Sequence, residues 1–351
     1  MKTCLIHCLR DNEWRRRTLF ALGIALLAAA TVLGRYMVAD SQGPVRLVVY
    51  GFSSQQDVMT QSVLPSFERA WEAETGRDLV IESLFGPSGT LAGQINLGAP
   101  ADLALFSNAQ HVEWLKFGKR VRWQTQPTTL GYTPMVIATR PGNPAGISGF
   151  ADLAQPGLRL VHADPRSSGA GEWAVLAEYG SAWHESADRA VAEAQLRSIW
   201  HNVRLLAPSA RSAMTLFELG AGDALITYEQ EALLALDRGV ALEIVTPAHT
   251  ILAEHVAVIV DDNVTSIERP VVRQLLSFIT NAGQHHFHDY YLRTAGQQPG
   301  FGAPLNDPMV VEDLGGWSQA YSSLVKTLWE AEIEPYLSLE SAPTLMGSGG
   351  D

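Results

Sequence analysis

The chain has 351 residues, of which 18% are charged and 46% are hydrophobic. This length predicts two domains that each bury a core, and the composition excludes a disordered chain or a collagen-like repeat. The first 40 residues carry six basic and three acidic side chains, so the rest carries 19 basic and 34 acidic ones, a formal charge of −15. A nucleic-acid partner is not expected, because neutralising phosphates takes clustered Lys and Arg.

An uncharged apolar segment, residues 18–34, directly follows three consecutive arginines. A basic region before an apolar region is typical of a secretion signal, and this one is also nearly long enough to remain in a bilayer. We interpret residues 1–40 as a signal peptide or membrane anchor, with the rest of the chain outside the cytoplasm. The only cysteines, Cys4 and Cys8, precede the apolar segment, so the exported part needs no disulfide.

Strands and helices are expected to alternate along the exported part. Residues 46–50 predict a first strand, and Ser54 with Asp57 predicts a capped helix that starts near Gln55 and ends at Gly76. Further strands are expected at 79–82, 101–106, 135–138, 158–162, 203–206, 224–227 and 251–260. Further helices are expected at 91–97, through Trp173 and Leu176, up to Gly220, at 271–291 and at 317–330. This order predicts an α/β fold of two doubly wound lobes with mainly parallel sheets.

Four loops between an expected strand and an expected helix are rich in Ser and Gly. They contain residues 53–54, 86–90, 167–171 and 209–212. In open α/β sheets such loops lie at the carboxyl ends of strands, where ligands bind, and each helix start offers unpaired N–H groups and a positive dipole end. Each loop alone is typical of an ordinary helix cap, but several that converge would hold an anion without a cationic side chain.

Five motifs occur in the order and spacing of one protein family. They are Pro165-Arg-Ser-Ser-Gly-Ala-Gly-Glu-Trp173, Ser209-Ala-Arg-Ser212, Gly222-Asp-Ala-Leu-Ile-Thr-Tyr-Glu-Gln-Glu-Ala232, Glu243-Ile-Val-Thr-Pro-Ala-His-Thr-Ile-Leu-Ala-Glu254 and Gly315-Gly-Trp317. From about Val45 to Leu328 the chain resembles the sulfate-binding branch of the type II periplasmic solute-binding proteins, receptors of anion ABC importers. Residues 86–95 and 98–103 resemble the molybdate/tungstate branch more closely.

The resemblance implies an oxyanion site made of N–H and O–H donors. The implied ligand-binding residues are Ser53, Ser88, Ser168, Gly169, Ala170, Ala210, Arg211 and Tyr228. Tyr228 stands where the family has a tryptophan that donates its indole N–H, and Ala170 replaces a glycine, which requires a negative φ there. We expect Arg211 to pack beside the site and hold loop backbone rather than to contact the ligand directly.

Sulfate or thiosulfate is the expected ligand, and molybdate, tungstate and phosphate remain alternatives. A site made only of donors favours a fully deprotonated dianion, because the proton of hydrogen phosphate would meet no acceptor. Asp164 precedes one loop and is the acceptor that a phosphate site would need.

An enzyme and a metal site were weighed against this interpretation. Ser168 with His162 would be a nucleophile and a base, but no third partner can be assigned and the common hydrolase and nucleotide motifs are missing from the sequence, so we expect no catalytic residue. His285, His286 and His288 form a His-rich stretch, which we expect to be a solvated helix surface rather than a metal site.

The resemblance also implies a domain organisation and partners. Lobe one would comprise 44–131 and 257–351, and lobe two 132–256, with crossovers near 132–134 and 251–254. The implied protein captures its anion in the periplasm, closes by hinge motion and docks on the permease of an ABC importer. The alternative is a membrane-anchored anion sensor on the same fold. We expect a monomer without cofactor that contacts the membrane only through its N-terminal segment.

Overall fold

A computed structural model of the chain describes residues 43–294, 301–302, 304–305 and 307–340. The predicted signal or anchor segment and both cysteines lie outside these residues. The chain divides into a small compact unit, of which 43–45 and 70–80 are described, and a large one with 46–69 and the residues from 81 onward. Every site residue discussed below belongs to the large unit. None of the described helices combines the length and apolar content needed to cross a membrane.

The strands form a mixed sheet in the order β2-β1-β3-β9-β4-β7-β5-β6, with β8 paired to β4. Their bounds are β1 Val45–Phe52, β2 Leu79–Gly86, β3 Leu103–Phe106, β4 Thr128–Thr139, β5 Leu160–Ala163, β6 Val203–Ala207, β7 Ala224–Tyr228, β8 Glu243–Val245 and β9 Leu252–Ile259. Strand β1 runs parallel to β3, and β5 runs parallel to both β6 and β7. We call β1 and β3 the first half-sheet, and β5, β6 and β7 the second half-sheet.

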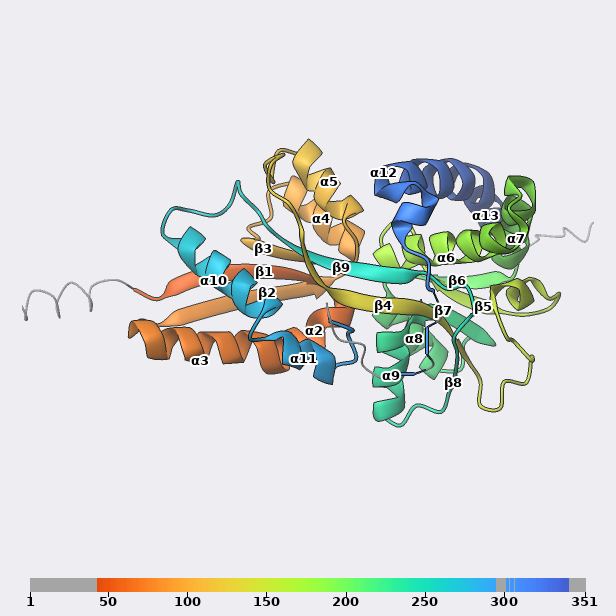
Figure 1. Ribbon diagram of the computed structural model, residues 1–351, viewed down its shortest axis with the longest axis horizontal. Coiled ribbons are helices and arrows are strands. Elements are labelled where there is room, and N and C mark those ends of the chain that lie inside the picture. Colours follow the sequence, from red (N-terminus) through yellow and green to blue (C-terminus); the bar gives the residue numbers. More distant parts are fainter. Residues whose placement is uncertain (1–42, 295–300, 303, 306, 341–351) are drawn as a thin grey trace, which may run out of the picture. The chain divides into compact units, whose positions relative to one another are not determined.

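Two long antiparallel strands, β4 and β9, join the half-sheets and lie side by side in Figure 1. Strand β9 also pairs with β3, and β4 with β7, in both cases antiparallel. The prediction of mainly parallel sheets is therefore wrong for these two strands. The segment 135–138, predicted as a short strand, is the end of the 12-residue β4. A strand that passes from one half-sheet to the other needs no helical crossover, so it is free to run antiparallel.

Helices follow most strands. They are η1 Ser53–Gln55, α2 Gln56–Val58, the π-helix η2 Met59–Val63, α3 Leu64–Thr75, α4 Ser88–Asn96, α5 Gln110–Phe117, α6 Gly169–Ser186, α7 Arg189–His201, α8 Ala210–Glu218, α9 Glu229–Asp237, α10 Glu268–Thr280, α11 Gln284–Asp289, η4 Val311–Leu314, α12 Gly316–Ala320, the π-helix η5 Tyr321–Ile333 and α13 Glu334–Glu340, with a 3-10 turn η3 at Phe150–Ala154. Helices α5, α7 and α9 were not predicted, and α4 begins three residues earlier than predicted.

The C-terminal helices pack on helices of the second half-sheet. Trp317 of α12 meets Trp173 of α6 edge to face at 4.5 Å between ring centroids, and Trp329 of η5 meets Trp200 of α7 at 5.2 Å. Trp173 and Trp317 are both buried. This part of the chain was assigned to lobe one, yet it packs on residues assigned to lobe two; the lobe boundaries themselves stay a prediction.

The predicted capping box at the first helix does not form. The α-helix α2 begins at Gln56, next to the predicted start, and the 3-10 turn η1 precedes it, but no side chain caps either start. The carboxylate of Asp57 instead accepts a hydrogen bond from Arg211 Nη1 at 2.8 Å. An ionised partner is the stronger attraction for a carboxylate than a backbone N–H, which accounts for the difference.

Candidate functional site

Four helix starts converge on one cavity, and each follows the carboxyl end of a strand. Helix η1 follows β1, α4 follows β2, α6 follows β5 and α8 follows β6. The serines at these starts are Ser53, Ser88, Ser168 and Ser209, and all of them line the cavity. Within each half-sheet the carboxyl ends of the parallel strands lie at one edge. Three antiparallel pairings separate the half-sheets, so β5 and β6 run opposite to β1 and the two edges face each other across the cavity.

The cavity is small and carries no charge on its lining. Its volume is about 10 Å³, whereas pockets for drug-sized ligands enclose roughly 300–1,000 Å³. The described residues that line it are Phe52, Ser53, Ser54, Gly86, Pro87, Ser88, Ser107, Ser168, Ala170, Ser209, Ala210 and Tyr228. Six of the eight predicted ligand-binding residues are among them, while Gly169 and Arg211 are not. Whether these residues bind a ligand stays a prediction.

Two hydroxyls at the cavity have no hydrogen bond of normal geometry within the described part of the chain, although they lie close enough to interact with each other. They belong to Tyr228, at the end of β7, and Ser107, directly after β3. Tyr228 is fully buried, and burial raises the pKa of its phenol well above the ordinary value, so it stays a donor at neutral pH. Sequence reasoning missed Ser107, although a serine directly after a fully buried strand was a signal that could have found it.

Serine side chains fix two of the helix starts. The hydroxyl of Ser168 accepts from the N–H of Ala170 at 3.2 Å, and that of Ser209 accepts from Ser212 at 3.1 Å. These caps hold the first turns of α6 and α8 so that their positive dipole ends meet at the cavity. Ala170 lies inside the α-helix α6, so its φ is helical, as its side chain requires.

Gly169 permits a close approach between elements of the two half-sheets. A Cβ at this position would overlap the hydroxyl of Ser107 and lie 2.7 Å from the amide nitrogen of Asn108. The N–H of Gly89 donates to the carbonyl of Ser167 at 2.9 Å, and the indole of Trp173 donates to the carbonyl of Ser107 at 2.8 Å. Elements of both half-sheets therefore surround the cavity and bond directly to each other.

Arg211 bridges two carboxylates beside the cavity. Its Nη1 lies 2.8 Å from Asp57 Oδ2, and its Nε lies 3.1 Å from Oε2 of the fully buried Glu231. Burial opposes the charge, but Glu231 and Asp57 outweigh it and raise the pKa of Arg211. Arg211 is not among the described residues that line the cavity, and its guanidinium makes these ion pairs instead of the expected bond to loop backbone; its role beside a ligand stays a prediction.

Substitutions of Arg211 and of Asp57 should differ in their effect on the free energy of unfolding. Arg211→Met should lower the free energy of unfolding by about 3 kcal/mol, because it leaves the buried Glu231 without a cation. Asp57→Asn should cost less than about 1 kcal/mol, since this pair is partly exposed. Urea unfolding of both variants tests this, and equal stabilities would contradict the assignment.

His255 of β9 packs behind Tyr228. Its ring centroid lies 5.0 Å from that of Tyr228 and 4.6 Å from that of Phe52, and its Nδ1 lies 3.3 Å from Nε2 of Gln55. The side chain is fully buried, and burial lowers its pKa to about 3. It is therefore neutral in the folded protein at every pH at which the protein is expected to work.

The buried His255 predicts a loss of stability in acid. Below its ordinary pKa of about 6.5 the unfolded chain gains a proton that the folded chain does not, so stability falls as pH decreases towards about 3. The His255→Gln protein should lack this component, which amounts to at most about 1.4 kcal/mol per pH unit. Urea unfolding between pH 7 and 4 measures it, with exposed His285→Gln as control; equal pH slopes in wild type and His255→Gln would contradict the prediction.

The alternative sites do not assemble among the described residues. His162 Nε2 lies 2.6 Å from Oε1 of Glu178, inside the core, and the hydroxyl of Ser168 caps α6 instead of facing it. Asp164 accepts hydrogen bonds from Arg166 and is not part of the cavity lining. No cluster of three or more metal-ligating side chains occurs in the part of the chain that the structure describes.

Comparison with known proteins identifies the family. A model of the family described as bacterial extracellular solute-binding protein matches residues 47–293. The chain belongs to this family. The sulfate-binding protein of Synechococcus elongatus is 31% identical over 331 residues, which cover 88% of this chain and 93% of that protein. The thiosulfate-binding protein of Escherichia coli is 29% identical over 263 residues, 71% of this chain and 75% of that protein.

A solved structure confirms the predicted fold class. The sulfate-binding protein SubI from Mycobacterium tuberculosis H37Rv aligns with a TM-score of 0.71 at 24% identity, covering 80% of this chain and 99% of that one. The α/β architecture predicted from the alternation of strands and helices is therefore the architecture of that protein as well.

Proposed function

We propose that this extracellular solute-binding protein is the receptor of an ABC importer, that it captures a tetrahedral oxyanion, sulfate or thiosulfate, and that it delivers the anion to a membrane permease. The observation that carries the proposal is the convergence of four helix starts and the Tyr228 hydroxyl on one uncharged cavity. Helix N-termini and hydroxyls supply N–H and O–H donors, which an anion accepts from all sides. The ligand-binding residues we assign are the six predicted ones that line the cavity.

The size and chemistry of the cavity favour an inorganic dianion. A volume of about 10 Å³ favours a small, compact ligand over a large one. Asp164, the acceptor that hydrogen phosphate would need, is engaged by Arg166 outside the cavity. The similarity to sulfate- and thiosulfate-binding proteins supports the same ligand class and a place in the periplasm.

The proposal accounts for an anion ligand in an acidic protein. Most of the described acidic side chains that contribute to the charge of −15 on residues 41–351 are at least partly exposed, and salt screens these within about 8–10 Å. The donors at the cavity act at hydrogen-bond distance, where partial charges on four helix starts are not offset by a lining carboxylate.

Titration calorimetry at pH 7 tests the proposed function. The folded protein is titrated with sulfate, thiosulfate, molybdate, tungstate and phosphate in separate experiments. We expect saturable binding with one site per chain, tightest for sulfate or thiosulfate and weakest for phosphate. Binding of molybdate or tungstate alone would assign the larger oxyanions instead, and binding of none of the five would contradict the receptor proposal.

A further inference from the structure

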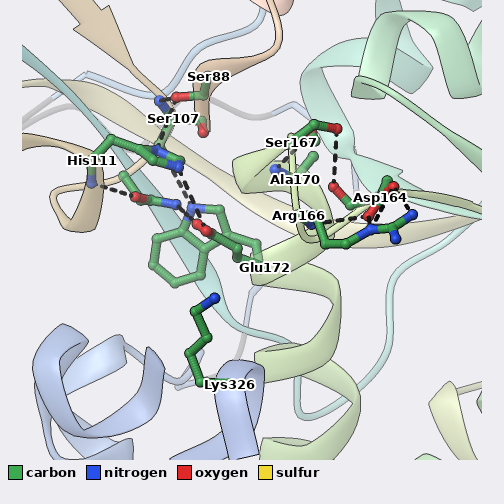
Figure 2. Close-up of polar contacts among 12 residues, drawn as sticks. Ser88, Ser107, His111, Asp164, Arg166, Ser167, Ala170, Glu172 and Lys326 are labelled. Carbon is green, nitrogen blue, oxygen red and sulfur yellow. Dashed lines mark hydrogen bonds and ion pairs between the residues drawn. The ribbon is translucent and has the colours of Figure 1, made fainter. Parts of the chain in front are cut away.

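A buried chain of three polar side chains lies directly behind the cavity. The Oγ of Ser88 lies 3.1 Å from Nδ1 of His111, and Nε2 of the same ring lies 3.5 Å from Oε1 of Glu172. Figure 2 shows the imidazole of His111 between Ser88 and Glu172. The His111 and Glu172 side chains are each 1% exposed. These three side chains link α4 and α5 to α6, and Ser88 lines the cavity.

The other bonds of this chain restrict where its protons lie. Glu172 Oε2 accepts from the amide of Asn108 at 2.6 Å, and Ser88 Oγ accepts from the N–H of Ser107 at 3.1 Å. At the junction between His111 and Glu172, neither Nε2 nor Oε1 has a hydrogen bond of normal geometry to any described residue. The other hydrogen bonds therefore do not fix how many protons His111 and Glu172 hold between them.

The protonation state of the His111–Glu172 pair determines whether the Ser88 hydroxyl presents a hydrogen-bond donor or an acceptor to the cavity. A serine hydroxyl has one donor and two acceptor positions, and Ser107 occupies one acceptor. If Nδ1 of His111 is unprotonated, the Ser88 hydroxyl donates to it and presents a lone pair to the cavity, which repels an anion. If Nδ1 carries a proton, it donates to Ser88, and the Ser88 hydroxyl is free to donate to the anion.

Glu172 determines how Nδ1 becomes protonated. With an ionised carboxylate, neutral His111 keeps its proton on Nε2, facing Glu172, so Nδ1 is an acceptor. Nδ1 carries a proton as well only when the pair gains one, either as imidazolium with carboxylate or as neutral imidazole with carboxylic acid. A dianion in the cavity favours the same gain, because it raises the cost of an uncompensated carboxylate buried behind the site.

We propose that the His111–Glu172 pair takes up one proton from solution when the cavity takes up its dianion, and that this proton turns Ser88 into a donor to the ligand. The inference rests on the proposed function and deepens it, since it makes anion capture proton-linked. No covalent bond changes: the proton comes from the buffer and returns to it on release. His111 and Glu172 act as positioning residues, because Ser88 alone of the three lines the cavity.

The other groups packed around the His111–Glu172 pair do not account for the uptake of a proton. Trp114 and Phe106 pack on the His111 ring, and neither titrates. The titratable groups facing Glu172 are Tyr228 on β7 and Tyr321 on η5, and burial raises the pKa of both phenols, so they stay neutral in the range tested below. Lys326 and Glu330, also on η5, pair with each other at 2.6 Å.

Calorimetry in buffers of different ionisation enthalpy counts the protons. The full chain is titrated with sulfate at half-unit steps from pH 5.5 to 9, in two buffers at each pH. We expect uptake that approaches one proton per sulfate in part of this range, and an affinity that falls there by up to about tenfold per pH unit. Sulfate binding without proton uptake at any pH would overturn the inference and leave the proposed function standing; absence of sulfate binding would contradict both.

Two variants assign the proton to the pair. Glu172→Gln keeps the size of the side chain and its acceptor for Asn108, while its amide donates to Nε2 and leaves the proton of His111 on Nδ1. We expect this protein to bind sulfate without proton uptake and with a flat pH profile. The control Glu113→Gln removes a carboxylate from α5 that pairs with Lys116 away from the cavity, and it should keep the wild-type uptake. Unchanged uptake in Glu172→Gln would overturn the assignment.

Discussion

The Gly169→Ala protein is expected to bind sulfate about 10- to 100-fold more weakly than the wild type. The added methyl group would overlap the hydroxyl of Ser107 and crowd the amide of Asn108, so the elements that surround the cavity could not approach to their observed distance. Overpacking of this kind costs about 1–3 kcal/mol. Because the contact forms between the two half-sheets, we expect the loss in sulfate affinity, measured by calorimetry, rather than in folding.

Two further proteins make this prediction specific. Gly93→Ala, in the middle of α4, adds the same methyl group where no atom lies within 4 Å, and it should bind as the wild type does. Ser107→Gly removes the overlapped hydroxyl. In the Ser107→Gly protein, Gly169→Ala should therefore lower the sulfate affinity by a smaller factor than it does in the wild type. Wild-type affinity in Gly169→Ala would show that the half-sheets do not need this approach for binding.

The Tyr228→Phe protein is expected to gain stability and lose affinity. Its hydroxyl is buried and has no hydrogen bond of normal geometry among the described residues, so removing it should raise the free energy of unfolding of the ligand-free protein by about 1 kcal/mol. If the hydroxyl donates to the anion, the same change should weaken sulfate binding about 10- to 100-fold, the value of a hydrogen bond to a charged group.

Opposite signs for the two measurements separate a ligand-binding hydroxyl from a structural one. Urea unfolding without sulfate gives the stability, and calorimetry gives the affinity. Tyr291→Phe serves as control, because its hydroxyl bonds to Asp237 away from the cavity, and it should leave sulfate affinity unchanged. Loss of stability together with unchanged affinity in Tyr228→Phe would remove Tyr228 from the proposed site.

The sequence allowed prediction of the loops that meet at the cavity, because the signal for each is local. A buried strand followed by Ser and Gly predicts a helix start, and the α/β order predicts that such starts lie at the carboxyl ends of strands, where ligands bind. The helix start near Gln55 was also predicted, but its cap was wrong. Asp57 bonds to Arg211, a residue distant in sequence, and a local pattern carries no information about such a partner.

The contacts behind the cavity could not be predicted either, because their partners are also distant in sequence. His111 of α5 contacts Ser88 of α4 and Glu172 of α6, and Trp173 of α6 bonds to Ser107, only through tertiary packing between elements distant in sequence. Glu172 lies in the motif of residues 165–173, but nothing in that motif indicates His111 as its partner, and Ser107 and His111 lie in none of the five motifs. The direction of β4 was missed because an apolar strand has the same composition whether its neighbours run parallel or antiparallel to it.

A crystal structure of the protein with selenate, a heavier analogue of sulfate, would show where the anion binds. The anomalous signal of selenium locates the anion without ambiguity. The proposed function predicts one selenate in the cavity, with its oxygens in hydrogen-bond contact with Ser88, Tyr228 and the first N–H groups of α6 and α8, and with no Arg or Lys side chain touching it. Selenate bound only at surface cations such as Arg166, with the cavity empty, would contradict it.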